Sequence, residues 1–216
     1  MAGMVSRVNR ASLTGVRLRR NLMLAAIIIG FVLSLLWSWA PPMIMLREEL
    51  HVGCSLLSMG DEPGEYYCGD GIGYLLPVFS LLGVSLVACF IAAAITLMAA
   101  SDRARPTLNL IALAPAFFIA GGTWVAAHNT WPKDNVVEHW LETMGAAATW
   151  LLATVVFAIV AAFVSPRAAA LCSFAAAASA IAAAATQPGI TVAAATSAGI
   201  LIAAAVGRPP TAVPTR

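Results

Sequence analysis

The chain has 216 residues, of which 61% are hydrophobic and only 10% are charged, with a formal net charge of +2. Soluble domains carry about 25% charged residues, so this composition excludes an ordinary soluble protein, and we expect no nucleic-acid partner. Apolar stretches of about 20 residues recur along the chain, and each is long enough to cross about 30 Å of hydrocarbon. The sequence therefore predicts an all-α integral membrane protein with one membrane domain at residues 22–206.

The N-terminal segment, residues 1–21, contains no acidic residue. Its basic residues are Arg7, Arg10, Arg17, Arg19 and Arg20. The first apolar stretch follows at residues 22–40, and a cleaved signal peptide is the alternative to a retained helix, since residues 38–40 loosely fit a cleavage site. Because Pro41 would follow that cut and the basic segment is long, we expect a retained span preceded by a basic cytoplasmic segment.

Six apolar stretches predict a six-span helix bundle. They lie at about residues 22–40, 73–100, 107–127, 136–164, 168–186 and 189–206, and a short cytoplasmic tail follows at residues 207–216. Residues 101–106 predict a tight basic turn before the third span. Pro115 predicts a kink inside that span, because proline removes one helical hydrogen bond. Asn135 followed by Glu138 predicts a capping box at the start of the fourth helix.

The longest polar segment between spans, residues 37–74, contains Cys54 and Cys68. Disulfides persist in oxidising compartments, so a loop outside the cytoplasm favours a bond between these two cysteines. Their spacing does not fit a C-x-x-C redox pair. We therefore expect a structural disulfide that pins the loop between the first and second spans. Cys89 and Cys172 lie inside spans and are expected to pack as small apolar side chains.

The charges are distributed unevenly between the segments that connect the spans. If the N-terminus is cytoplasmic, every arginine except Arg47 falls on the inner side, and every acidic residue except Asp102 falls on the outer side. Basic residues near span ends mark the cytoplasmic face. The preference for arginine over lysine is typical of a GC-rich bacterial genome. We expect a multi-pass protein of the bacterial cytoplasmic membrane with both termini in the cytoplasm and anionic lipid at its basic inner face.

Two groups of residues on the outer side carry side chains of the types that bind metal ions. His51, His128 and His139 all fall on the outer side, with Glu138 beside the last of them, and imidazole and carboxylate groups bind zinc or copper. No pair has the spacing of helical ligands, so we expect solvated side chains and no metal. The acidic residues of the first outer loop lack the alternating oxygen ligands of a calcium loop. They are Asp61, Glu62, Glu65 and Asp70.

No catalytic motif or cofactor fingerprint is present, and away from their ends the spans lack the ionisable residues of proton relays. We therefore expect neither an enzyme nor a cofactor. The fifth and sixth spans are rich in alanine, and small residues such as Ala176, Ser179 and Ala183 allow helices to approach closely, either within the chain or against another membrane subunit.

From these features we expect a non-catalytic accessory or assembly subunit of a larger membrane complex, for example a respiratory or cell-envelope assembly. Its partners would be the lipid bilayer and other integral membrane subunits. The alternative is a small-molecule or lipid transporter or exporter, which the number of spans and Pro115 favour, because transporters use helices that are broken at membrane depth.

Overall fold

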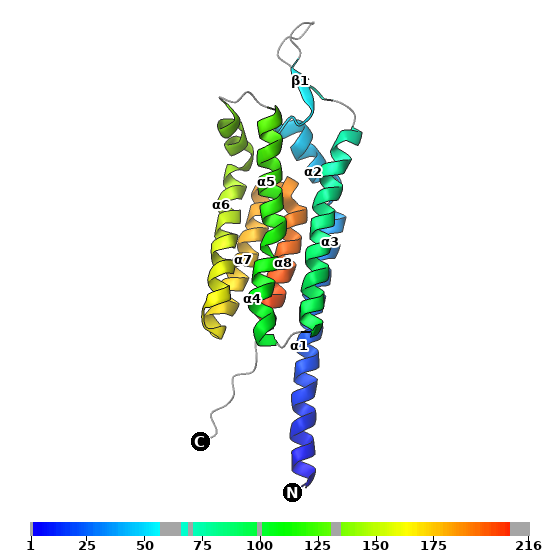
Figure 1. Cartoon of the computed structure of the whole chain (residues 1–216), viewed down its shortest axis with the longest axis vertical. Coiled ribbons are helices and arrows are strands. Elements are labelled where there is room, and N and C mark those ends of the chain that lie inside the picture. The colour runs from blue at the N-terminus through cyan, green and yellow to red at the C-terminus, as the bar shows by residue number, and fades with distance from the viewer. Residues whose placement is uncertain (1, 57–65, 69–70, 99–100, 131–134, 208–216) are drawn as a thin grey trace.

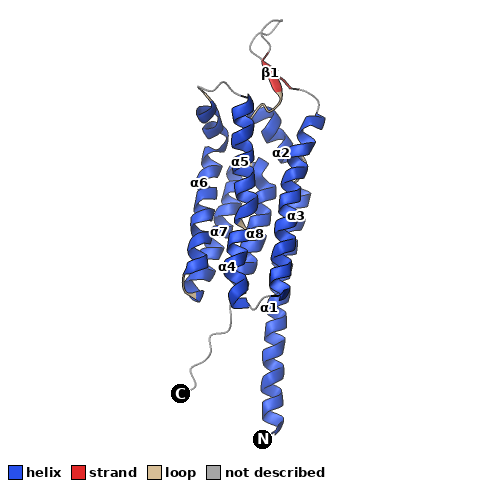
Figure 2. Ribbon diagram, viewed as in Figure 1, coloured by secondary structure: helices blue, strands red, loops and turns tan. Residues whose placement is uncertain are grey.

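The computed structural model describes residues 2–56, 66–68, 71–98, 101–130 and 135–207, and over these residues the protein is a helix bundle (Figures 1 and 2). Within this part of the chain six helical segments are long and apolar enough to cross a membrane, which confirms the predicted helical architecture. They are Gly15–Leu36, Ile72–Met98, Ala104–Thr130, Val136–Phe163, Pro166–Thr186 and Pro188–Val206.

The chain runs up and down the bundle. The first half contains α1 (Ala2–Leu36), α2 (Ala40–Ile44), the π-helix η1 (Met45–Glu49), β1 (Cys54–Leu56), β2 (Tyr66–Cys68), the 3-10 helix η2 (Gly71–Tyr74) and α3 (Leu75–Met98). The second half contains α4 (Ser101–Ile111), α5 (Leu113–Thr130), α6 (Val136–Phe163), α7 (Pro166–Thr186), the 3-10 helix η3 (Pro188–Ile190) and α8 (Thr191–Val206). We call the end that carries β1 and β2 the hairpin end, and the end where α1 begins the basic end (Figure 1).

Helix α1 begins much earlier than the predicted span at residues 22–40. The basic segment 1–21 was predicted to precede the helix, but from Ala2 onward it continues α1 without a break. Arginine favours helix and no proline interrupts the segment. At 1.5 Å per residue, this 35-residue helix is about 52 Å long, against about 30 Å for the hydrocarbon core of a bilayer. In Figure 1 it projects beyond the other helices at the basic end.

Helix α8 occupies the centre of the bundle. Of its apolar stretch, 78% is buried inside the protein, against 22–44% for the other five stretches. Ile200 and Leu201 are fully buried, and most of the other buried residues of α8 are alanines, such as Ala203 and Ala204. Small side chains let helix backbones approach closely where no hydrophobic effect drives association. The alanine-rich sequence is therefore placed where close packing requires it.

Helices α1 and α8 approach each other closely at two glycines. A Cβ atom at Gly30 would lie 2.8 Å from the carbonyl oxygen of Ala195 and 2.8 Å from the Cα of Gly199. On the α8 side of the contact, a Cβ at Gly199 would lie 2.8 Å from the carbonyl oxygen of Ala26 on α1. One turn from Gly30, the buried Ser34 hydroxyl lies 2.7 Å from Thr196 Oγ1 on α8. Two glycines thus allow direct backbone contact, and hydroxyl groups complete it.

Near Pro115, where a kink is predicted, the helix is interrupted by the single residue Ala112 between α4 and α5. Proline has no N–H to donate to the carbonyl of Ile111, four residues earlier, and its ring crowds that carbonyl. Helix α4 accordingly ends at Ile111 and α5 begins at Leu113. The next carbonyl, that of Ala112, accepts a 2.7 Å hydrogen bond from the Ser197 hydroxyl on α8. A neighbouring helix therefore contacts the backbone beside the interruption.

Two local predictions are wrong. Residues 101–106 do not form a turn, because α4 already begins at Ser101, and Arg105 is only 6% exposed on a helical face that it shares with Leu108 and Asn109. The proposed capping box is also not formed. Asn135 precedes α6 in a near-helical conformation, with φ of −115° and ψ of −2°, and its side chain makes no capping hydrogen bond. An N-cap side chain reaches its target from the extended region.

Residues 40–50 fold back over the hairpin end instead of extending away from it. Pro41 and Pro42 stand in the first turn of α2, where a missing N–H costs nothing. Met45 and Leu50 are then buried against the side chains of the second core cluster, which includes Met144. The polar segment at residues 37–74 thus contributes core residues before the chain reaches the disulfide.

Candidate functional site

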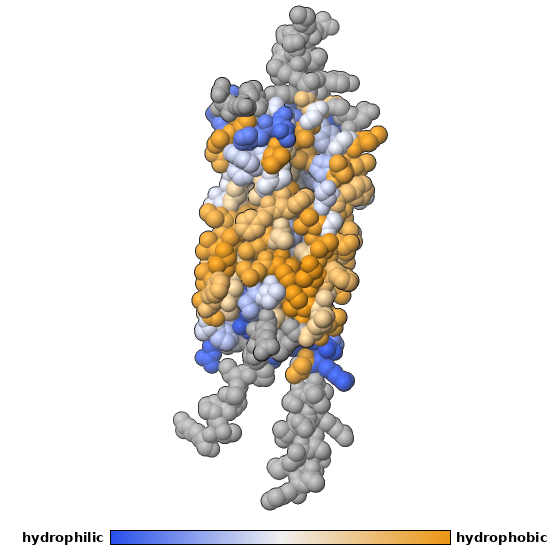
Figure 3. Space-filling model, viewed as in Figure 1, coloured by the Kyte–Doolittle hydropathy of each residue, from blue (hydrophilic) through white to orange (hydrophobic). Residues whose placement is uncertain are grey.

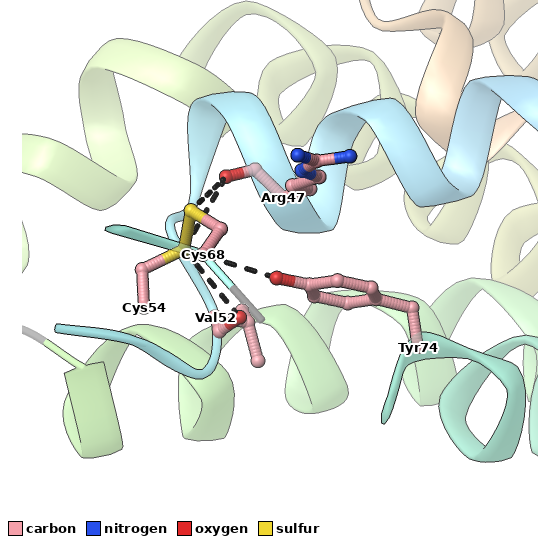
Figure 4. The surroundings of a disulfide bond; sticks show 5 residues. All are labelled: Arg47, Val52, Cys54, Cys68 and Tyr74. Carbon is pink, nitrogen blue, oxygen red and sulfur yellow. Dashed lines mark hydrogen bonds between the residues drawn. A yellow bond between two sulfur atoms is a disulfide. The ribbon is translucent and has the colours of Figure 1, made fainter. Parts of the chain in front are cut away.

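The disulfide between Cys54 and Cys68 is present, as predicted, and it joins the two ends of the hairpin where β1 pairs with β2. Figure 4 shows its surroundings. The sulfur of Cys54 lies 3.8 Å from the Tyr74 hydroxyl, and both sulfurs face the carbonyl of Arg47. Since a disulfide sulfur carries no hydrogen, the Tyr74 hydroxyl is the donor among these groups. The bond is covered by protein on one side, as expected of a structural disulfide.

The candidate metal ligands do not assemble. Over the described residues, no three His, Cys, Asp or Glu side chains lie close enough to share an ion. His139 Nδ1 lies 3.3 Å from Glu142, Glu138 is exposed, and His128 packs against Trp124 with ring centroids 4.7 Å apart. His51 stands in a turn with φ of 49°. The four acidic residues weighed as calcium ligands, at positions 61, 62, 65 and 70, lie outside the described residues.

A buried glutamine, which sequence reasoning missed, ties the hairpin end together. Gln187 is 5% exposed and lies between α7 and η3. Its Nε2 donates to Glu49 Oε2 at 2.5 Å and to the carbonyl of Thr143 at 3.1 Å, and its Oε1 accepts from Gly189 N at 3.3 Å. One side chain thereby connects η1, α6 and η3. Buried polar groups that are fully hydrogen-bonded in this way fix one arrangement of the surrounding elements.

The predicted helix-packing face is buried inside the chain. Ala176, Ser179 and Ala183 are 0%, 5% and 0% exposed. They lie on α7, which packs between α6 and α8 (Figure 1). Of the two uses considered for these residues, the structure places them in contacts within the chain, so they do not belong to a surface that another subunit can reach.

A second buried polar group lies near the break between α4 and α5. Asn109 is fully buried, and its Oδ1 accepts a 3.0 Å hydrogen bond from the Ser173 hydroxyl on α7. Its Nδ2 has no hydrogen-bond partner among the described residues. Arg105 precedes Asn109 by one helical turn on α4. Beyond the end of α4, the Ser197 hydroxyl of α8 donates a hydrogen bond to the carbonyl of Ala112. These groups place hydrogen-bonding capacity inside the bundle, toward its basic end.

An apolar groove of about 570 Å³ runs along the outside of the bundle between α1, α7 and α8. Small buried residues form its floor, and exposed aliphatic side chains form its rim. The floor includes Gly30, Ala194, Ala198 and Gly199, and the rim includes Leu22, Ile29, Leu33 and Ile181. The groove exists because α1 meets α8 at two glycines and leaves α7 uncovered beside them. A smaller groove of about 320 Å³ separates α3 from α5 near the hairpin end.

Sequence reasoning missed this groove, although one signal for it was present. Ala26, Gly30 and Ser34 recur every four residues along the first span and mark a face for close helix contact. Comparison of the chain with protein-family models, with curated proteins and with solved structures gives no match in any of the three. The functional argument therefore depends on the geometry of the chain itself.

Proposed function

We propose that this chain is a non-catalytic accessory subunit of a larger complex in the bacterial cytoplasmic membrane, such as a respiratory or cell-envelope assembly. The observation that supports this function is the basic first part of α1, residues 2–20, which we call the α1 arm; the beginning of α1 projects beyond the other helices (Figure 1). The arm contains five arginines and no acidic residue. A basic helix held away from its own protein is suited to an acidic surface on a partner subunit, because complementary charges direct and orient association.

The orientation that we propose places the basic end in the cytoplasm. In Figure 3 an apolar belt separates two polar ends. Arg19 and Arg167 lie at the end where α1 enters the bundle, whereas Glu49, Glu138 and Glu142 lie at the hairpin end. Arginines near span ends favour the cytoplasmic side. The same orientation exposes the Cys54–Cys68 disulfide to an oxidising compartment, where such bonds persist.

Reporter fusions test this topology directly. A fusion after Ser165, between α6 and α7, is expected to report a cytoplasmic position, and a fusion after Gln187, between α7 and η3, an external position. A phosphatase that is active only outside the cytoplasm and a fluorescent protein that folds only inside it give opposite readouts at each site. If both sites report the same side, α7 does not cross the membrane and the six-span arrangement is wrong.

The arm is tested by charge reversal. The variant carrying Arg7→Glu and Arg10→Glu is expected to weaken partner retention in gentle detergent by about ten-fold or more, since each exposed ion pair contributes up to about 1 kcal/mol and 1.4 kcal/mol is ten-fold. Arg47→Glu, an exposed arginine at the hairpin end, is the control and should leave retention unchanged. The reporter fusions show whether the arm variant keeps its orientation. Undiminished retention would exclude the arm as the docking element.

A transporter is the second candidate, and the broken α4–α5 helix favours it. Transporters place discontinuous helices and polar groups at membrane depth, and here Asn109, Ser173 and Ser197 lie at such a break. If this function is correct, the isolated protein will carry out saturable uptake in reconstituted vesicles and Asn109→Leu will reduce it. Saturable uptake without any stable partner would overturn the accessory function.

A further inference from the structure

We infer that the groove between α1, α7 and α8 binds one anionic phospholipid, with an acyl chain along the groove and the headgroup phosphate at Arg19. The groove and the charge are independent observations, since the groove comes from the helix packing and the charge from the sequence of α1. The inference does not depend on the accessory function, because a lipid site can serve a subunit or a transporter equally.

The size of the groove suits an alkyl chain. Its edge on α1 runs from Leu22 to Trp37, which is about 22 Å at 1.5 Å per residue. One leaflet of hydrocarbon is about 15 Å thick, so an extended chain fits within this length. The lining is almost entirely apolar along this length, as an acyl chain requires.

The charge of Arg19 lies at one end of the groove, on the side of α1 that lines it. Arg19 precedes Leu22 by three residues and Ala26 by seven, so all three project from the same side of α1. Leu22 and Ala26 line the groove, and Arg19 is half-buried. Arg17, two residues earlier, projects from the opposite side of the helix and is exposed. Arg19 is thus placed at the level where the apolar lining begins, as a headgroup contact requires.

The preference of the groove for an anionic lipid follows from its position inside a bilayer. Lipid tails are as apolar as leucine, so filling the groove inside a bilayer gains no hydrophobic free energy. A lipid must therefore be held by close packing along the chain and by its headgroup charge. One arginine near the membrane surface favours an anionic lipid by about five-fold over a neutral one. Trp37, 53% exposed, marks the other end of the groove.

The test uses the purified full-length protein in a neutral detergent, mixed with phosphatidylglycerol or phosphatidylcholine of identical acyl chains, and native mass spectrometry counts the retained lipid. The wild type is expected to retain one phosphatidylglycerol about five-fold more strongly than phosphatidylcholine. Arg19→Gln should remove this preference, and Arg17→Gln should keep it. Equal retention of both lipids by the wild type would overturn the proposal.

A matched pair of alanines on α7 tests the groove itself. Ala184 lines the groove and Ala182 does not, although both are half-buried. Ala184→Leu is expected to lower phosphatidylglycerol retention about ten-fold by occupying the space of the chain, and Ala182→Leu to leave it unchanged. Equal effects of the two changes would show that the lipid binds elsewhere.

A second measurement keeps the test decisive if Ala184→Leu unfolds. Ile29 lines the groove about 15 Å from Arg19 at 1.5 Å per residue, within reach of a bound chain. In a variant that carries Ile29→Trp and has phenylalanine in place of its native tryptophans, brominated phosphatidylglycerol should quench the fluorescence more strongly than brominated phosphatidylcholine at the same mole fraction. Equal quenching contradicts a selective site. Efficient cross-linking of a partner protein to a photoreactive residue at Ala25, which lines the groove, would identify a protein as the occupant and overturn the proposal.

Discussion

Gly30→Ala will destabilise the protein by about 1–3 kcal/mol, the usual cost of inserting one extra group into a packed interior. The sign of this change in the free energy of unfolding is informative. Alanine is the better helix former by about 1 kcal/mol, so an unhindered Gly30→Ala change would stabilise α1. At Gly30 the new Cβ would meet the carbonyl of Ala195 and the Cα of Gly199, each at 2.8 Å. Backbone atoms cannot turn aside as a flexible side chain does, so α1 and α8 must separate.

The matched control is Gly83→Ala on α3. Gly83 has no atom within 4 Å of its added Cβ, so this variant should be as stable as the wild type or slightly more stable. Denaturant unfolding in detergent, followed by circular dichroism, measures both. Because Gly30 and Gly199 touch each other, Gly30→Ala and Gly199→Ala should combine non-additively. A stabilised Gly30→Ala protein would mean that α1 and α8 do not meet at these glycines.

Removing the disulfide by Cys54→Ser and Cys68→Ser will loosen the hairpin end while the helices persist. The two cysteines are separated by 14 positions, and closing a loop of that length contributes about 3 kcal/mol in the chain-entropy model. Hydrogen exchange reports such local opening, so amides of η1 and β1 are expected to exchange up to about a hundred-fold faster. Amides of α8 should not change, because α8 is held by other helices.

Cys172→Ser is the control for this variant, since Cys172 is a free, half-buried cysteine on α7 far along the chain from the hairpin. It should leave exchange in η1 and β1 unchanged. Peptide mass analysis without reduction should also find Cys54 joined to Cys68 and Cys89, which is 6% exposed, protected from alkylation until the protein unfolds. Unchanged exchange in the double variant would show that the disulfide does not hold the hairpin end.

The features that the sequence could predict are those that depend on local chemistry. Six apolar helices follow from length and hydropathy, and the break before Pro115 follows from the missing N–H of one proline. The disulfide follows from two cysteines in one loop. The signal for the α1–α8 contact was weaker, because in a chain this rich in alanine small residues at four-residue spacing occur in nearly every helix. Which of them meet is decided by tertiary packing.

The hairpin end was the least predictable part. A capping box was expected at Asn135 from residue types alone, but backbone conformation decides whether a side chain reaches the helix N-terminus, and here it does not. The role of Gln187 had no signal, since its partners Glu49 and Thr143 come from distant segments. Loop residues are placed by contacts that only the folded bundle supplies.

The central position of α8 has a consequence for the order of biosynthesis. Ser34 on α1 and Val192 on α8 are 158 residues apart in the chain, so at about 5–20 residues per second a ribosome needs roughly 8–30 s to deliver the second after the first. During that interval the α1 face has no partner in the nascent chain. The Ser34 hydroxyl can donate a hydrogen bond within α1 during this time, because it lies 2.9 Å from the carbonyl of Gly30 in its own helix. Its hydrogen-bonding capacity can thus remain satisfied in lipid until α8 arrives.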